Sequence, residues 1–195
     1  MTEQETMNNN EKNDYNTNTD EISMLADNND TQKLSSINIK NRYLLFLTAI
    51  IIILFDQGSK NWISNNLSFS HPINVFGDYL RLFLAHNYAL VWSIPIRNDL
   101  VYYILPAIGI IVVIFIAFRT RIAYYAFSFG LILGGAVGNL IDRVRIGYVI
   151  DFIDMGIKNT RWPTYNIADL AIDVGLIMII AREIFIRDRN KKLIG

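Results

Sequence analysis

Cysteine is absent from the 195 residues, and only two histidines, His71 and His86, are present. The absence of cysteine excludes disulfides, thiolate nucleophiles and Cys-ligated metals. Two histidines are too few for a His-rich metal site, and we expect neither a metal nor another cofactor. Lysine plus arginine and aspartate plus glutamate number 18 each, so the overall charge indicates no nucleic-acid partner.

The first part of the chain has few aliphatic side chains. Residues 1–38 are rich in Asn, Asp, Glu and Thr. A segment of this composition buries too little apolar surface to offset the entropy lost on ordering. We therefore expect residues 1–38 to form a disordered polar tail, and residues 39–190 to form one membrane domain. The start of the chain lacks the basic-then-apolar pattern of a signal peptide.

The chain contains four long apolar stretches. A helix needs about 20 mostly apolar residues to cross a bilayer. The sequence therefore predicts an all-α membrane protein with four transmembrane helices. These helices are expected at about 43–63, 100–118, 122–141 and 167–186.

Basic residues cluster at one end of each expected span. Lysine and arginine in short loops remain on the cytoplasmic side of a membrane. This rule places both termini in the cytoplasm and the loops at 64–99 and 142–166 at the outer face. The basic residues concerned are Lys40, Arg42, Arg119, Arg121, Arg182, Arg187, Arg189, Lys191 and Lys192.

The third apolar stretch carries a line of small residues at four-residue spacing. Such a line lies on one face of a helix and allows neighbouring helix backbones to approach closely. We expect it to serve packing. Its members are Ala126, Gly130, Gly134 and Gly138.

The outer loop at 64–99 alternates apolar and polar residues, as in YLRLFLAHNYALVWS at 79–93. Alternation with aromatic residues is typical of short strands. Trp62, Trp92 and Trp162 all fall at expected outer-interface positions, as in aromatic belts. We expect a small extracytoplasmic sheet that lies on the membrane surface.

Three aspartates, Asp142, Asp151 and Asp169, lie between the third and fourth spans. A carboxylate at the bilayer centre costs about 2.5–3.5 kcal/mol on insertion scales, so such residues need partners or a function. Two carboxyl groups that share a proton can activate water. The pattern predicts an intramembrane aspartyl hydrolase. Asp151 and Asp154 flank Phe152 and Ile153 in an apolar loop that we expect to dip toward the helices.

Asn139, Asp142 and Arg143 share one helical face. A purely structural alternative for Asp142 is an ion pair with Arg143 or Arg145, because charges within a membrane normally pair. Under either interpretation, we expect Arg143 to organise the site.

Asn166 and Asp169 open the fourth span, where a capping box is an equally good structural interpretation. Asp173 lies one turn further along the same face and is a rival for the acid–base role. Asp56 and Lys60 are four residues apart, which favours a structural salt bridge.

Serine nucleophiles fit less well. Ser59 and Lys60 are adjacent and so point apart on a helix, and Ser93 has no evident base. A serine–lysine hydrolase stays open as an alternative.

Five motifs together resemble the type II (lipoprotein) signal peptidase family. The resemblance covers about residues 40–187, with the motifs in matching order and spacing. The motifs are DQGSK at 56–60, Asn87 to Ser93, GGAVGNLIDRV at 134–144, VIDFID at 149–154 and YNIAD at 165–169.

The resemblance implies an aspartyl endopeptidase that removes signal peptides from prolipoproteins, cutting before a diacylglyceryl-modified cysteine. It implies that Asp151 and Asp169 form the catalytic dyad. It further implies a multi-pass protein of the bacterial cytoplasmic membrane, in contact with membrane lipid, with its active site near the outer face. We take a monomer as the default state. The supporting residues would be Asp56, Lys60, Asn87, Asn139, Asp142, Arg143 and Asn166.

The chain departs from the family pattern at four positions. Ala89 and Trp92 replace the usual glycine and phenylalanine after Asn87, which affects the expected substrate fit. Tyr165 stands where phenylalanine is usual, and Asp173 where a small or uncharged residue is usual.

Two functions of another class remain open. A small proton or ion channel or transporter would use Asp142, Asp169 and Asp173 as a relay. A relay needs ionisable groups at several depths, whereas these cluster near one face apart from Asp173. A non-catalytic scaffold would tolerate the loss of both dyad carboxyls.

Overall fold

The computed structural model describes residues 38–69, 71–88, 99–158 and 160–194. The tail expected over 1–38 lies outside this part apart from Asn38, and so do Ala89, Trp92 and Ser93. Contacts within the chain separate the unit Asn41–Gly195 from the residues before it. This unit is described by itself below.

Four helices agree with the four predicted apolar stretches. The first described helix covers Asn38–Asn66. It is followed by α2 (Asp99–Arg119), α3 (Ala123–Ile146) and α4 (Ile167–Ile194). Among the described residues, three helices are long and apolar enough to cross a membrane, Asn38–Asn66, Val101–Arg119 and Ala123–Ile146. The fourth helix, α4, is not in this set; its apolar stretch is interrupted by charged residues such as Asp173, Arg182 and Glu183.

The first helix buries one stripe and exposes the opposite apolar face. Leu45, Ala49 and Ile63 are buried, as are the charged Asp56 and Lys60. A helix that exposes apolar side chains over this length suits a lipid environment. The exposed face includes Leu47, Ile50, Leu54 and Phe55.

The small-residue line of α3 lies where helices meet, as predicted. A Cβ on Gly134 would be 2.8 Å from the Ala49 carbonyl oxygen, and a Cβ on Gly138 would be 2.6 Å from Asp56 Oδ2. On another side, a Cβ on Gly135 would collide with the Ala168 backbone of α4. Close approach at these glycines therefore lets α3 contact both the first helix and α4.

The strands predicted within 64–99 are present, but the sheet is larger than expected. β1 (Ile73–Phe76) and β2 (Leu80–Asn87) are joined by β3 (Val149–Ile157) and β4 (Thr160–Arg161). The four strands are antiparallel in the order β1-β2-β3-β4. The segment around Asp151 is a strand and not the expected loop, but it does approach the helices, because the Ile150 N–H donates to Asp142 Oδ2 at 3.3 Å. The start of β3 is buried on both faces, so VIDFID lacks the alternation that marks a half-buried strand.

β3 separates two environments. Its even-numbered side chains Ile150 and Phe152 pack in a core with Ile63, Leu67 and Leu84. Successive side chains of a strand point to opposite faces, so the odd-numbered Asp151 points away from the face that carries Ile150 and Phe152. Packing of Ile150 and Phe152 in this core thereby fixes the direction of the Asp151 carboxyl group.

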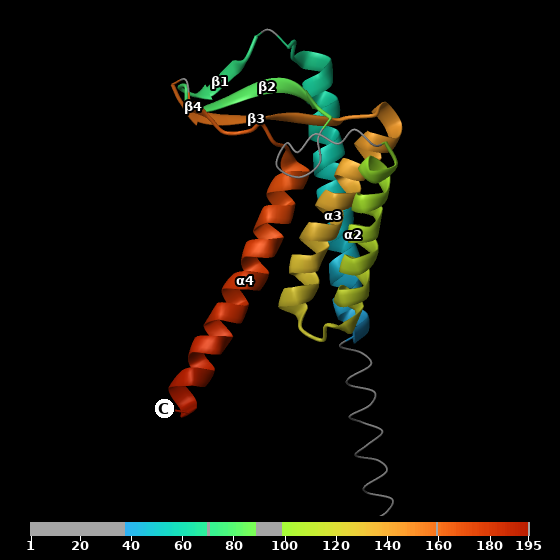
Figure 1. The fold of residues 1–195 in the computed structure, drawn as a ribbon, viewed down its shortest axis with the longest axis vertical. Helices are drawn as coiled ribbons and strands as arrows, with labels where there is room; N and C mark the ends of the chain where they lie inside the picture. Colours follow the sequence, from blue (N-terminus) through green and yellow to red (C-terminus); the bar gives the residue numbers. More distant parts are fainter. Residues whose placement is uncertain (1–37, 70, 89–98, 159, 195) are drawn as a thin grey trace, which may run out of the picture. The chain divides into compact units, whose positions relative to one another are not determined.

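The sheet lies at one end of the helices, and the C-terminal ends of α2 and α4 lie at the other (Figure 1). Arg119 is in the last turn of α2, and Arg187 and Arg189 lie in the C-terminal part of α4. Arg42 lies over the Phe118 ring at 5.1 Å, near that end. Arg42, Arg119, Arg187 and Arg189 therefore lie toward the end opposite the sheet.

Candidate active site

The predicted Asp56–Lys60 salt bridge is present and forms part of a larger buried cluster. Lys60 is 2% exposed, and its Nζ lies 2.8 Å from Asp56 Oδ2 and 2.9 Å from Asp142 Oδ2. The same Nζ donates to Asn139 Oδ1 at 3.0 Å. Removing one partner of a buried ion pair costs about 3–5 kcal/mol, because the other charge is left uncompensated. Lys60 thus ties the first helix to α3.

The structural alternative for Asp142 named the wrong partner, because the ion pair that the structure gives Asp142 is with Lys60 and not with Arg143 or Arg145. Arg143 instead donates to the Asn139 carbonyl oxygen at 3.2 Å and lies over the Tyr102 ring at 5.0 Å. Arg145 donates to Gln57 Oε1 at 3.4 Å. Local spacing favoured the nearby arginines, whereas tertiary packing brings a distant lysine closer.

Gln57 is a site residue that sequence reasoning missed. Its Nε2 donates to Asp142 Oδ1 at 2.9 Å and to the Gly138 carbonyl oxygen at 3.2 Å. The available signal was its place next to Asp56 in DQGSK, a polar run within an apolar span. Asp56 also accepts from the Ala168 backbone N–H at 3.0 Å, which joins the cluster to the first turn of α4.

The side chain of Asn139 connects the Lys60 cluster to the start of α4. Its Oδ1 accepts from Lys60 Nζ and, at 3.1 Å, from Asn166 Nδ2. Its Nδ2 therefore faces the opposite way and donates to Asp169 Oδ1 at 2.7 Å. Two donors on the oxygen fix the orientation of the amide.

The capping box predicted at the start of α4 is present. The Asp169 N–H donates to Asn166 Oδ1 at 2.9 Å, and the Asn166 N–H donates to Asp169 Oδ2 at 3.3 Å. This reciprocal arrangement satisfies backbone donors at the helix start. Since Asp169 Oδ1 is still bonded to Asn139, the cap and the site use the same carboxyl group.

Asp151 meets the same network from β3. It is 2% exposed, and its Oδ1 accepts from Asn166 Nδ2 at 2.7 Å. Its Oδ2 accepts from Asn87 Nδ2 at 2.9 Å, across the β2–β3 pair. Asn166 thus contacts both Asp151 and Asp169, the two residues expected to form a dyad.

Burial raises the pKa of Asp151 to about 7, and the negative charge of Asp169 acts in the same direction. The hydrogen bonds from Asn87 and Asn166 and the charge of Lys60 oppose this shift, because they favour the ionised form. A carboxyl group with a pKa near 7 can hold or release a proton at neutral pH, as general acid–base chemistry requires.

Two other acidic candidates, Asp154 and Asp173, lie outside this network. Burial alone would raise the pKa of Asp154, but hydrogen bonds from Arg161 and Arg81 outweigh burial and lower it below its ordinary value. Asp154 Oδ2 lies 2.6 Å from Arg81 Nη2 and 2.9 Å from Arg161 Nη2, so it braces the sheet. Asp173 is exposed on α4.

Metal binding is a separate question. Across the described ranges, no three or more His, Asp or Glu side chains are grouped so that they could hold a metal ion. Asp151 and Asp169 are two carboxyl groups positioned by amide donors. Such an arrangement can bind and polarise a water molecule.

Comparison with known proteins agrees with the resemblance seen in the motifs. Residues 48–185 match the family described as signal peptidase (SPase) II. A lipoprotein signal peptidase of Buchnera aphidicola is 39% identical over 150 residues, which are 73% of this chain and 96% of that protein. One of Francisella tularensis subsp. novicida is 35% identical over 153 residues, covering 74% of this chain and 94% of that protein.

Two solved structures, each described as a bacterial membrane enzyme studied by the in meso method, have a similar fold. They superpose with TM-scores of 0.68 and 0.65 at 28% identity. They cover 76% and 71% of this chain, and 90% of each solved chain. With the family match over most of its length, this chain belongs to the signal peptidase II family.

Proposed function

We propose that this chain, as a member of the family that removes signal peptides from lipoproteins, acts as an aspartyl endopeptidase. Asp151 and Asp169 are its catalytic pair. The substrate is a lipid-modified prolipoprotein, and the cut falls before the diacylglyceryl-modified cysteine. The observation that carries the proposal is the buried Asn166 side chain, which is hydrogen-bonded to Asp151 through Nδ2 and to the Asp169 backbone through Oδ1.

The two carboxyl groups share one proton and titrate as a unit. The ionised member removes a proton from a bound water, whose oxygen attacks the scissile carbonyl carbon. The protonated member gives its proton to the carbonyl oxygen. The resulting tetrahedral diol collapses as the C–N bond breaks. The amine nitrogen takes the proton from the carboxyl group that deprotonated the water, and a diol hydroxyl gives its proton to the other carboxylate, so the pair again holds one proton. A pKa near 7 for Asp151 suits this exchange at neutral pH.

The remaining polar residues position the pair. Asn87 and Asn166 hold the Asp151 carboxyl, and Asn139 holds that of Asp169. Lys60 orients the Asn139 amide, and Asp56 and Asp142 compensate the charge of Lys60. Arg143 secures the α3 backbone at Asn139. None of these residues needs to exchange a proton with the substrate.

The proposal places the sheet at the outer face of the membrane and both termini in the cytoplasm. α4 acts as the fourth span, and residues 39–190 work as one monomeric domain behind a polar tail. The basic residues at the end opposite the sheet support this orientation. The reaction then takes place beside the lipid headgroups, where water enters and the lipid anchor stays in the bilayer.

Substitution of the pair tests the proposal. Asp151→Asn and Asp169→Asn each abolish cleavage of a lipidated prolipoprotein peptide by purified protein in lipid, because neither amide can exchange the shared proton. Asp173→Asn is the matched control and leaves cleavage within about twofold, since this exposed residue lies outside the network. Product is measured by mass spectrometry.

Cleavage by Asp151→Asn at the unchanged rate would refute the catalytic pair. Proton flux into liposomes without any peptide cleavage would instead favour the channel alternative. A scaffold would keep its function with both substitutions.

A further inference from the structure

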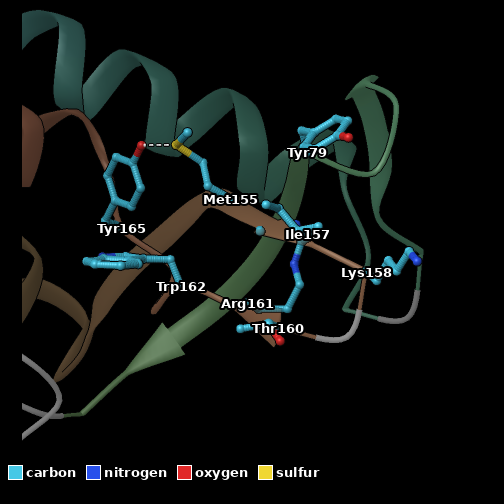
Figure 2. A pocket seen from close by; sticks show the side chains of 9 residues that line it. Tyr79, Met155, Ile157, Lys158, Thr160, Arg161, Trp162 and Tyr165 are labelled. Carbon is cyan, nitrogen blue, oxygen red and sulfur yellow. Dashed lines mark hydrogen bonds between the residues drawn. The ribbon is translucent and has the colours of Figure 1, made fainter.

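A pocket of about 1110 Å³ opens on the sheet, and its lining includes neither Asp151 nor Asp169. Figure 2 shows the Tyr165 and Trp162 side chains next to each other, with the Tyr165 hydroxyl directed at Met155. This hydroxyl donates to Met155 Sδ at 2.8 Å. The lining residues used below are Tyr79, Met155, Ile157, Lys158, Trp162 and Tyr165.

The pocket lies on the same face of the sheet as the Asp151 carboxyl. Met155 and Ile157 follow Asp151 on β3 by four and six residues, and even spacing along a strand places side chains on one face. The pairing of Tyr165 with Ile153 puts Tyr165 on this face as well. At about 3.4 Å per residue, Met155 lies roughly 14 Å and Ile157 roughly 20 Å along the strand from Asp151.

One wall of the pocket is continuous with the catalytic site. The Tyr165 carbonyl oxygen accepts from the Phe152 and Ile153 backbone N–H groups, at 3.0 and 2.7 Å. The next residue, Asn166, donates to Asp151. The segment that carries the Tyr165 ring therefore leads directly to the dyad.

We propose that this pocket binds the part of the substrate that follows the cleaved bond, at about the fourth to sixth residue after it. This inference rests on the proposed function. An apolar signal peptide and the lipid on the cysteine both stay in the bilayer, so only the chain after the cysteine leaves along the sheet. An extended chain advances about 3.3–3.6 Å per residue, which brings its fourth to sixth residues opposite Met155 and Ile157.

The lining defines the chemistry that the pocket accepts. Trp162 is 73% exposed and Ile157 is 62% exposed, so an apolar or aromatic side chain that covers them removes apolar area from water. Lys158 adds an exposed positive charge, whereas the Arg161 guanidinium is held by Asp154. The pocket therefore favours an apolar or aromatic substrate residue, while the positive Lys158 and the negative Asp173, whose charge acts on Tyr165, leave no single charge preference beside it.

Peptide length is the variable that tests this inference. Two lipidated prolipoprotein peptides, ending two and eight residues after the cysteine, are cleaved by the full chain in lipid vesicles. We expect kcat/KM to be about tenfold higher for the long peptide, because its additional residues bind the pocket at a distance from the cleaved bond and stabilise the transition state by about that factor. Trp162→Ala lowers kcat/KM for the long peptide to that for the short peptide and leaves kcat/KM for the short peptide unchanged. We expect the same result, independently, from Ile157→Ala.

Trp62→Ala is the matched control, because Trp62 is 53% exposed and does not line the pocket. It keeps the length dependence. Equal kcat/KM for both peptides in the unsubstituted protein would overturn the inference. An equal loss for both peptides in Trp162→Ala, reversed by more lipid, would also overturn it and indicate a membrane contact. Both results leave the catalytic pair standing, whereas cleavage by Asp151→Asn would refute the pair itself.

Discussion

Asn166 performs two tasks with one buried side chain. Its Oδ1 caps α4 through the Asp169 N–H, while its Nδ2 donates to Asp151 Oδ1 and lies within 3.1 Å of Asn139 Oδ1. Residues of this type are common at helix starts for structural reasons alone. Here the cap orients a side chain that also holds a second carboxyl group, so the stability of the helix start and the geometry of the site depend on the same amide.

Substitution of Asn87 should shift the pH dependence of cleavage. The hydrogen bond from Asn87 Nδ2 favours the ionised form of Asp151 and so opposes the rise of its pKa. Asn87→Ala removes this donor, and the pKa of Asp151 rises further. The pair then keeps its shared proton to higher pH, and the alkaline limb of kcat/KM moves up by about one pH unit.

The limb is measured from kcat/KM at closely spaced pH values. Asn65→Ala, at an exposed position on the first helix, serves as the control and leaves the limb in place. A limb that stays fixed or moves to lower pH in Asn87→Ala would contradict the role given to Asn87.

Short motifs made part of the site predictable. The contact between Asp56 and Lys60 lies within one helix, and that between Asn166 and Asp169 lies at one helix start. In both places the distance along the sequence decides which side chains meet. The pairing of Asp142 with Lys60 joins two helices far apart in the sequence. No local rule contains that information, and for the same reason Gln57 was overlooked.

At the scale of elements, β3 shows where pattern reading reaches its limit. Periodicity identifies a strand when one face is exposed to water, and the alternation at 79–93 predicted β2 in that way. The start of β3 is covered on both sides, so its apolar run lacked the period of two and was mistaken for a loop. The helices were easier to predict, because side chains that face lipid and side chains that are buried are both apolar, and the stretch needed to cross a bilayer has a fixed length.

The small-residue line of α3 leads to a prediction about packing. A Cβ on Gly138 would be 2.6 Å from Asp56 Oδ2 and would push a buried charged group, so Gly138→Ala should destabilise the protein by roughly 1–3 kcal/mol. A Cβ on Gly58, which lies within the first helix, would meet no atom within 4 Å. Gly58→Ala should therefore be neutral or stabilise by up to about 1 kcal/mol through helix propensity.

Thermal unfolding of the two variants in the same detergent provides the measurement. We expect a lower Tm for Gly138→Ala, together with reduced cleavage, and an unchanged or higher Tm for Gly58→Ala. Equal Tm values for the two variants would show that α3 and the first helix do not approach as closely as these contacts require.

At the scale of the whole molecule, the site and the C-terminal ends of two helices lie at opposite ends. The carboxyl pair, its amide donors and the sheet lie at one end of the helices, and the C-terminal ends of α2 and α4 lie at the other (Figure 1). The sequence predicts that the basic clusters before the first span, between the second and third spans, and after the fourth span all fall on one side of the membrane. The exception is α4, whose charged residues keep it outside the set of described helices that are apolar enough to cross a membrane.

Labelling of single cysteines decides whether α4 crosses the membrane. The chain has no cysteine, so each variant carries one thiol. In spheroplasts, a membrane-impermeant maleimide should label Asn65→Cys, at the sheet end of the first helix, without permeabilisation. It should label Thr120→Cys, between α2 and α3, and Arg189→Cys, near the end of α4, only after permeabilisation. If α4 lay along the outer surface, Arg189→Cys would react in intact spheroplasts while Thr120→Cys stayed protected, and the four-span topology would fall although the site geometry remained.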